Sequence, residues 1–241
     1  MRQWIGSIVF TSYLFLSVPF YSVFAFGAVL FPGVSPFSAA RAWARSILGA
    51  LKLLCGLDCE IEGQEHLDRE NCVVLLKHSS AWETIAQFII FPPQQTWVMK
   101  RELLWVPILG WVLSLFKPIA INRKGGRQAV EQVVKQGQQR LDEGFWVMIF
   151  PEGTRVPIGQ KRRYGISGAL LAATSGRPVI PVAHDAGRYW PRRGLLKRPG
   201  TIQLVIGQPI VTAGKDPRLL NSQVEAWIDA KVAELETARG G

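Results

Sequence analysis

The sequence is poor in the residues that cross-link small secreted domains or hold structural metal ions. Its 241 residues include only three cysteines and three histidines. The cysteines, Cys55, Cys59 and Cys72, are too few and too irregularly spaced for a disulfide framework, and no second Cys or His pair follows them at a metal-ligand spacing. We therefore expect three reduced cysteines that pack in the interior, as in a cytoplasmic protein.

Acidic residues are also scarce, and one segment has almost none. The chain has 28 Lys and Arg against 18 Asp and Glu, and Arg155–Arg198 holds ten basic residues and one acid, Asp185. Such a basic segment favours anionic lipid headgroups, nucleic acid or a phosphorylated substrate. Apart from Tyr189 and Trp190, this segment lacks interleaved solvent-facing aromatics for base stacking, and no recognition helix is apparent, so we expect no nucleic-acid partner.

Charge is missing altogether from residues 3–40. Within them, Trp4–Phe31 is a nearly continuous apolar run, and about 20 such residues suffice to span a bilayer. Pro19 divides the run, and Pro32-Gly33 closes it. Two geometries are therefore open: a single tilted and kinked span, or a helix–turn–helix hairpin that dips into one leaflet.

Positive charge flanks the apolar run on both sides, at Arg2, Arg41, Arg45 and Lys52. The heavier C-terminal flank predicts that the main domain stays on the cytoplasmic side of a membrane. A cleaved signal peptide would have a more charged start and a shorter apolar core. We expect residues 1–38 to anchor the chain in the membrane and residues 39–241 to form an α/β domain.

After a short linker, apolar strands alternate with helices. This alternation is typical of an α/β fold, with a largely parallel or mixed sheet flanked by helices. Functional groups then lie on loops at the carboxyl ends of strands. The predicted strands are Cys72–Leu76, Thr96–Met99, Ile119–Ile121, Phe145–Phe150, Val179–Ala183 and Ile202–Ile206, and the predicted helices are Ala39–Leu57, Ala81–Phe91, Arg127–Glu143 and Pro217–Glu236.

The loop Lys77–Glu83 follows a predicted strand and contains a histidine and a carboxylate. Such a pair suits general-base chemistry, because the carboxylate holds one ring nitrogen and leaves the other free to accept a proton. On one continuous helix, His78 and Glu83 would point about 140° apart. They can meet only if His78 lies in the loop and Glu83 in the first helical turn, with Ser79 and Ser80 as caps. A purely structural role for this histidine is the alternative.

The loop Asn122–Arg127 lies between a strand and a helix. Arg123 and two further cations stand there beside two glycines, and a helix N-terminus adds backbone donors and a favourable dipole. The loop is therefore a candidate anion site, with an exposed polar turn as the alternative.

The loop Pro151–Arg155 follows another predicted strand. Gly153 permits close approach of the backbone to a ligand, and Thr154 and Arg155 are suited to binding phosphate oxygens. Glu152 is expected to order a nearby cation. The next apolar strand, Val179–Ala183, contains a proline of the kind found on edge strands and is interpreted as scaffold.

Taken together, these segments resemble the glycerolipid acyltransferase family, and specifically its bacterial 1-acyl-sn-glycerol-3-phosphate acyltransferases. The family pattern is His-x4-Asp, an Arg that closes a strand, Glu-Gly-Thr-Arg and an apolar strand with Pro. The matching residues in this chain are His78, Glu83, Arg123, Glu152–Arg155 and Val179–Ala183, within a likeness that covers roughly Glu60 to Gln208.

The resemblance implies the role of each residue and the reaction. His78 would be the general base, Glu83 its orienting carboxylate, and Arg123 with the loop Glu152, Gly153, Thr154 and Arg155 the phosphate site. Lys100 matches a family segment that often helps bind the substrate phosphate. The reaction would move a fatty acyl group from acyl carrier protein or acyl-CoA to the sn-2 hydroxyl of 1-acyl-sn-glycerol-3-phosphate (lysophosphatidic acid), giving phosphatidic acid.

The same resemblance implies a location and several absences. The partners would be membrane phospholipid, the lysolipid and the thioester carrier, at the cytoplasmic face of the bacterial inner membrane. We expect no acyl-enzyme, no metal ion and no bound cofactor. Two other functions are kept as alternatives: acyl transfer to a different lysolipid, such as a lyso-ornithine lipid or a lysophospholipid, and a non-catalytic adaptor for anionic membranes.

Glu83 departs from the family pattern, which usually has Asp at this position. The additional methylene carries the carboxylate about 1.5 Å further from the backbone. The carboxylate can still hold the imidazole if the backbone lies slightly further back, whereas a misaligned pair would lower activity. Because the other motifs are intact, we expect a working enzyme.

Overall fold

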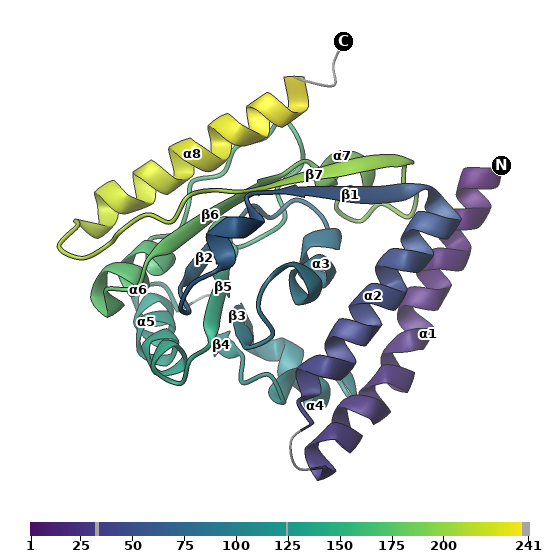
Figure 1. Cartoon of the computed structure of the whole chain (residues 1–241), viewed down its shortest axis with the longest axis horizontal. Helices are drawn as coiled ribbons and strands as arrows, with labels where there is room; N and C mark the ends of the chain where they lie inside the picture. Colours follow the sequence, from purple (N-terminus) through teal and green to yellow (C-terminus); the bar gives the residue numbers. More distant parts are fainter. Residues whose placement is uncertain (32–33, 124, 238–241) are drawn as a thin grey trace.

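A computed structural model of the chain describes residues 1–31, 34–123 and 125–237. Its centre is one sheet with the strand order β1 (Leu57–Glu62), β7 (Gly200–Ile206), β6 (Val179–His184), β2 (Val73–Leu76), β5 (Trp146–Ile149), β3 (Gln95–Lys100) and β4 (Ile119–Ile121) (Figure 1). All neighbouring strands are parallel except β6 and β7. The predicted α/β class with a largely parallel or mixed sheet is confirmed.

Helices cover both faces of the sheet (Figure 1). The helices are α1 (Arg2–Leu30), α2 (Pro36–Cys55), α3 (Trp82–Ile90), α4 (Leu109–Ser114), α5 (Arg127–Asp142), α6 (Ser167–Ser175), α7 (Ala186–Tyr189) and α8 (Pro217–Thr237), with 3-10 turns η1 (Gln64–Leu67) and η2 (Arg101–Trp105). One core cluster joins α2 and α3 to the sheet, and a second joins α5, α6 and α8 to the opposite face.

The six strands predicted from the sequence are all present, because buried strands of a parallel sheet are runs of apolar residues. β2, β5 and β6 are buried along their whole length. β1 is not predicted from the sequence, because its acidic residues Asp58, Glu60 and Glu62 alternate with apolar ones at the edge of the sheet. α6 and α7 are not predicted either, because α6 has no clear apolar stripe and α7 is a single turn.

Pro181, a proline of the kind found on edge strands, lies on an interior strand, because β6 lies between β7 and β2. The carbonyl of Pro181 accepts a hydrogen bond from the backbone N–H of Gly207 at 2.8 Å. The nitrogen and carbonyl of one strand residue point to the same side. The proline nitrogen therefore faces the end of β7, and no hydrogen bond to β2 is lost.

Helix α1 runs unbroken from Arg2 to Leu30, so the hairpin turn considered at Pro19 is wrong. A proline inside a helix removes one backbone hydrogen bond. Packing supports the helix on both sides of it: Nε1 of Trp43 in α2 donates to Oγ of Ser17 at 3.0 Å, and Ser22 is buried. One continuous helix results, long and apolar enough to cross a membrane.

The hairpin that does form consists of α1 and α2, which lie side by side and antiparallel (Figure 1). Its turn falls after Leu30 and before Pro36. Pro32 and Gly33, predicted to close the apolar run, lie outside the described residues. Close packing of the two helices requires Gly6, because a Cβ at this position would lie 2.1 Å from the carbonyl oxygen of Leu54.

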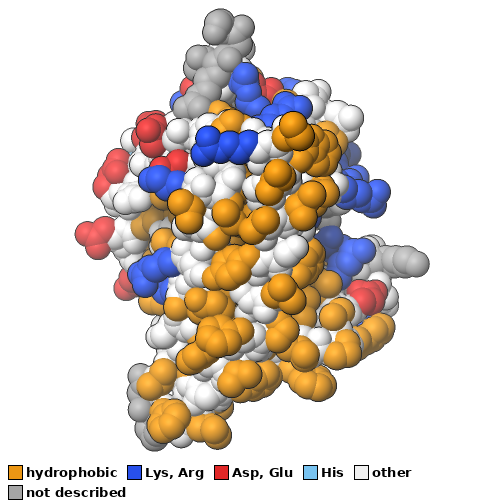
Figure 2. Space-filling view, turned by 90° about the vertical axis from the view of Figure 1, so that its right-hand side faces the viewer, with side chains coloured by type: hydrophobic (Ala, Val, Ile, Leu, Met, Phe, Trp, Pro, Cys, Tyr) orange, Lys and Arg blue, Asp and Glu red, His pale blue; other side chains and the backbone are white. Residues whose placement is uncertain are grey.

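The outward face of α1 is covered by large apolar side chains (Figure 2). Trp105 of η2 and Trp111 of α4, a helix that contacts α1, are exposed as well. Monomeric soluble proteins rarely expose apolar patches of this extent. The exposed residues of α1 include Trp4, Ile5, Ile8, Phe15, Leu16, Phe20, Val23, Phe24 and Leu30.

Candidate active site

The predicted site loops meet at one edge of the sheet. β2, β5, β3 and β4 are neighbours and parallel, so their carboxyl ends lie on the same side. β2 leads to His78, β5 leads to Glu152, β3 ends at Lys100, and β4 leads to Arg123. The structure thus brings together segments that are far apart in the sequence.

His78 and Glu83 contact each other directly. Nδ1 of His78 lies 2.9 Å from Oε1 of Glu83, with His78 in the loop and Glu83 in the first turn of α3. The backbone N–H groups of Ser79 and Ser80 donate to the same carboxylate oxygen at 2.9 and 2.8 Å. The sequence predicts Ser79 and Ser80 as caps, which is wrong, because the N-cap of α3 is Ala81; the hydroxyl of Ser80 accepts a hydrogen bond from the N–H of Trp82 at 3.1 Å. The pair is therefore aligned despite the longer Glu side chain.

The charge state of Glu83 defines the role of each nitrogen of His78. Burial raises the pKa of Glu83, whereas His184, His78 and the Ser80 amide lower it, and the net pKa lies below its ordinary value. An ionised carboxylate only accepts hydrogen bonds, so Nδ1 of His78 carries the proton, and Nε2 is an acceptor without a partner among the described residues. The imidazole also stacks on Phe150 with 4.2 Å between ring centroids, which restricts its orientation.

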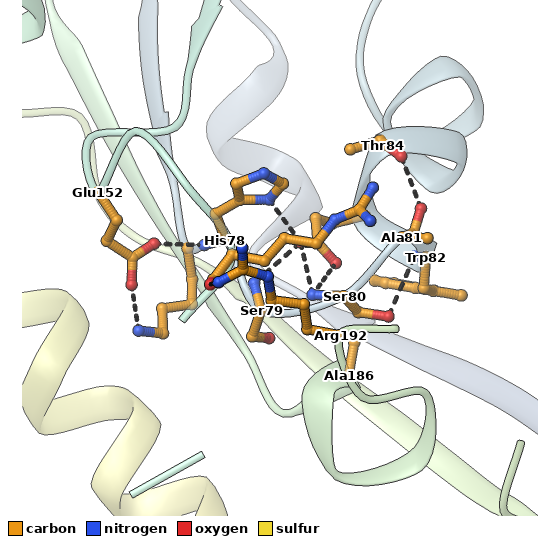
Figure 3. Close-up of polar contacts among 12 residues, drawn as sticks. His78, Ser79, Ser80, Ala81, Trp82, Thr84, Glu152, Ala186 and Arg192 are labelled. Carbon is orange, nitrogen blue, oxygen red and sulfur yellow. Dashed lines mark hydrogen bonds and ion pairs between the residues drawn. The ribbon is translucent and has the colours of Figure 1, made fainter. Parts of the chain in front are cut away.

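Glu152 holds the backbone of the histidine loop. Its carboxylate forms a buried ion pair with Lys77, and its Oε2 accepts the backbone N–H of His78 at 2.6 Å (Figure 3). Burial raises the pKa of Glu152 to about 7, although Lys77 lowers it. Lys77 is a partner that the sequence analysis does not name. The family resemblance implies that Glu152 belongs to the phosphate site. In the structure its side chain instead faces the histidine loop.

A cavity of about 670 Å³ lies beside His78. Part of its lining is apolar and comes mainly from α1, α2, α3, β3 and α4, including Trp43, Ile85, Phe88, Trp97, Val112, Leu113 and Phe116. The rest comes from the loops at the edge of the sheet and is cationic, with Lys100, Arg123, Arg155, Arg192 and Arg193. The cavity therefore offers room for a long apolar group together with donors for an anion.

Four of the residues predicted to bind substrate line this cavity: Lys100, Arg123, Thr154 and Arg155. Arg123 also donates a hydrogen bond to the carbonyl of Gly153, which joins the loop after β4 to the loop after β5. Gly153 has a φ of +68°, a left-handed conformation that favours glycine. Lys124, the neighbouring cation in the sequence, lies outside the described residues.

Arg192 and Arg193 are cavity residues that the sequence analysis counts only as part of a basic segment. They lie in the loop between α7 and β7, and Nη1 of Arg192 donates to the carbonyl of Arg155 at 3.1 Å. No local spacing marks these two arginines among ten basic residues. Only the long-range contact with the loop of Arg155 places them beside His78.

His184, at the end of β6, is a second histidine of the site that the sequence analysis does not select. Its Nε2 donates to the carbonyl of Lys77 at 2.9 Å, and its Nδ1 accepts the N–H of Ala186 at 3.2 Å. Burial lowers the pKa of His184, so the ring is neutral and its two hydrogen bonds define the tautomer. Nε2 also lies 3.8 Å from Oε2 of Glu83. His184 thus supports the backbone just before His78.

Lys197 differs from the predicted surface role of the basic segment, because its side chain is buried against α1. Its Nζ donates to Oγ1 of Thr11 at 2.6 Å and lies 4.9 Å from the ring centroid of Trp190. Burial lowers the pKa of Lys197. This lysine therefore fastens the loop before β7 to the N-terminal helix.

Metal-ligand clusters are absent from residues 1–31, 34–123 and 125–237: no three His, Cys, Asp or Glu side chains there are grouped to hold an ion. The expectation that the chain uses no metal ion or bound cofactor stays a prediction.

Two known enzymes are similar in sequence to this chain, one of them over nearly its whole length. The 1-acyl-sn-glycerol-3-phosphate acyltransferase of Pseudomonas aeruginosa is 42% identical over 243 residues, covering 97% of this chain and 92% of that protein. The enzyme of the same name from Saccharomyces cerevisiae is 29% identical over 175 residues, covering 70% of this chain and 57% of that protein.

The fold has a solved counterpart in the crystal structure of the 1-acyl-sn-glycerophosphate (LPA) acyltransferase, PlsC, from Thermotoga maritima. The two structures align with a TM-score of 0.80 at 20% identity, covering 98% of this chain and 96% of that one. Because only 20% of the residues are identical, the structural similarity establishes the shared fold alone. Residues 58–185, which contain His78, Glu83 and Glu152–Arg155, match the acyltransferase family. The chain belongs to the acyltransferase family.

Proposed function

We propose that the chain is a 1-acylglycerol-3-phosphate O-acyltransferase. It moves a fatty acyl group from acyl carrier protein or coenzyme A to the sn-2 hydroxyl of 1-acyl-sn-glycerol-3-phosphate and produces phosphatidic acid. The observation that carries this proposal is the His78–Glu83 pair beside a cavity that is apolar in one part and cationic in another. The names of the relatives from Pseudomonas aeruginosa and Saccharomyces cerevisiae support the same acceptor.

His78 acts as the general base. Its free Nε2 takes the proton of the acceptor hydroxyl while the oxygen attacks the thioester carbonyl. Glu83 stabilises the imidazolium that forms. When the C–S bond breaks, the imidazolium returns the proton to the thiolate, so no acyl-enzyme forms and the histidine is regenerated. Base catalysis supplies about 10²–10⁴ in rate, and positioning of the two reactants supplies much of the rest.

Arg155, Arg123, Thr154 and Lys100 bind the phosphate of the acceptor. Nε of Arg155 is buried and has no hydrogen-bond partner among the described residues. A buried donor without a partner is costly, and a phosphate oxygen in the cavity would satisfy it. The apolar lining, including Phe88, receives acyl chains. The volume of the cavity lies within the usual range of ligand pockets.

The α1–α2 hairpin seats the enzyme in one leaflet of the bacterial inner membrane, with the catalytic domain on the cytoplasmic face. Although α1 is apolar enough to cross, it packs along α2, which carries Arg41, Arg45 and Lys52. Charged side chains at the bilayer centre are costly, so α2 is unsuited to crossing. The exposed face of α1 enters the leaflet, and the basic segment faces anionic headgroups. Residues 1–38 supply most of this anchor.

The decisive experiment is an acceptor panel with one labelled acyl donor. Purified enzyme is given 1-acyl-sn-glycerol-3-phosphate, lysophospholipids with larger headgroups and a lyso-ornithine lipid. We expect 1-acyl-sn-glycerol-3-phosphate to give the highest kcat/KM. Faster transfer to another lysolipid would replace the acceptor in the proposal, and no transfer to any acceptor would favour the non-catalytic membrane adaptor.

His78→Ala is the matching variant. Because it removes the only proton acceptor proposed for the hydroxyl, we expect turnover to fall by about 10²-fold or more, with an unchanged circular dichroism spectrum. The third histidine, His66, contacts the carbonyl of Ile206 away from the cavity, so His66→Ala serves as the control. Turnover retained by His78→Ala would remove this histidine from the mechanism.

A further inference from the structure

The loop from Pro191 to Pro199 carries three arginines, and two of them, Arg192 and Arg193, line the cavity without a role in the proposed acceptor site. Arg192 and Arg193 are exposed, and both line the cavity that contains His78. Figure 3 shows Arg192 close to the loop of His78 and Ser79. The ion pairs formed by the described residues include neither arginine. Two cationic groups therefore stand beside the reaction centre without a carboxylate partner.

The two groups of cations reach the cavity from opposite sides of β2, and they meet where Nη1 of Arg192 donates to the carbonyl of Arg155. Lys100, Arg123 and Arg155 follow β3, β4 and β5, which lie on one side of β2 in the sheet. The loop of Arg192 and Arg193 follows β6 and α7, on the other side of β2. His78, which follows β2, lies between the two cationic groups in this order. A reaction that joins two anionic reactants at one histidine requires such a division.

The loop is braced where it presents the arginines. Its start is fixed to the catalytic loop, because Oγ of Ser80 donates to the carbonyl of Trp190 at 2.6 Å. Its end is fixed to α1 through the buried Lys197, whose backbone N–H donates to Oγ of Ser7 at 2.9 Å. Between them, Arg193 has a φ of +60°, a left-handed conformation that is uncommon for residues other than glycine, Asn and Asp. Such conformations are concentrated at functional sites.

We propose that Arg192 and Arg193 bind the phosphate at the end of the acyl donor's pantetheine arm. This inference rests on the proposed acyl transfer. Acyl carrier protein and coenzyme A both carry this phosphate, so the site serves either donor. Arginine suits this phosphate because a guanidinium binds phosphate oxygens in a bidentate manner. The acceptor phosphate then occupies the site of Arg155, and the thioester lies between the two phosphates at His78.

The test compares acyl-CoA with acyl-pantetheine, which has the same thioester and arm but no phosphate. Loss of one charge-assisted phosphate contact weakens binding about tenfold or more. We therefore expect Arg193→Ala to raise the KM for acyl-CoA about tenfold, while the KM values for acyl-pantetheine and for the lysolipid acceptor stay unchanged. Arg155→Ala is the comparator and should raise the acceptor KM instead.

Two further variants control for folding and for charge. Arg193→Gly suits a φ of +60° and keeps the loop conformation, so it must reproduce the effect of Arg193→Ala. Arg162→Ala removes an exposed arginine of the same basic segment that does not line the cavity, and it should leave the donor KM unchanged.

Several outcomes would overturn the inference. A rise in the acceptor KM would assign the arginines to the lipid phosphate, and equal losses with both donors would assign them a structural role. Reduced binding to anionic vesicles with an unchanged KM for micellar substrates would assign them to the membrane surface. Wild-type enzyme that transfers no acyl group at all would instead remove the proposed function.

Discussion

Three donors converge on the carboxylate of Glu83: Nδ1 of His78 and the backbone N–H groups of Ser79 and Ser80. The two amides belong to the turn before α3, so the backbone that carries His78 also holds the carboxylate that orients it. A buried carboxylate with several charge-assisted hydrogen bonds is strongly fixed. Nε2 of His78 is consequently the group left to accept a proton beside the cavity.

The charge of Glu83 is therefore predicted to matter more than its length. Glu83→Gln keeps an oxygen that can accept from His78, but it removes the negative charge that stabilises the imidazolium and replaces Oε2, an acceptor of the Ser80 amide, by an NH2 group. We expect kcat to fall about 10²-fold or more. Glu83→Asp keeps the charge and should retain much higher activity. Steady-state rates for both variants test this, and equal activities would make the carboxylate charge irrelevant.

At the scale of elements, α1 presents two different faces. Its buried positions are mostly small, including Gly6, Ser7, Ser17, Ser22, Ala25 and Ala28, which allows close packing on the rest of the chain. Its outward positions are large and apolar, as Figure 2 shows. The same helix therefore belongs to the protein interior on one side and suits lipid on the other.

Membrane binding is predicted to depend on the outward face of α1. Leu16 and Phe20 are 76% and 59% exposed. Insertion of one such side chain into lipid contributes roughly 1.5–3 kcal/mol, or about tenfold or more in affinity. Leu16→Asp combined with Phe20→Asp should release the enzyme from vesicles that contain anionic lipid, measured by co-sedimentation.

The control for this prediction is Gln132→Asp, which places one negative charge on the exposed surface of α5. It should leave vesicle binding unchanged. Full binding of the doubly substituted α1 variant would show that the membrane contact lies elsewhere on the molecule.

For the whole molecule, the buried and neutral His184 links stability to pH. Burial lowers the pKa of His184 below the ordinary value of 6.5, although the neighbouring Glu83 and Asp185 raise it. Below about pH 6.5 the unfolded chain therefore binds a proton that the folded chain does not, so acidification favours unfolding. His184 stabilises the fold fully above this pH, and the stabilisation is lost as the pH falls.

We expect the Tm of the wild-type protein to fall on acidification from about pH 7.5 to about pH 5.5, a range that includes the titration of an exposed histidine. His184→Gln can still donate to the carbonyl of Lys77 and accept from Ala186, but it does not titrate, so its Tm should fall less. Thermal unfolding followed at several pH values makes the comparison. Identical pH profiles for the two proteins would exclude His184 as the source.

Elements with a local sequence pattern are predictable from the sequence. The strands β2, β3, β4, β5, β6 and β7 follow from apolar runs, and the His78–Glu83 pair follows from a strand, a loop and a helix start within a few residues. β1 is missed because its acidic residues alternate with apolar ones at an edge position that only its pairing with β7 defines. Pro19 suggests a break in the apolar segment that does not occur, because packing of α1 on α2 compensates for the missing backbone hydrogen bond.

The sequence by itself determined the apolar N-terminal segment, the α/β class and the histidine–carboxylate pair, because each depends on neighbours within one or two elements. Only the tertiary structure decided that Lys77 partners Glu152, that Lys197 is buried against α1, and that Arg192 and Arg193 reach the cavity. These contacts join residues from 37 to 186 positions apart. Such distances leave no periodicity in the chain, since chain topology and burial alone set which side chains meet.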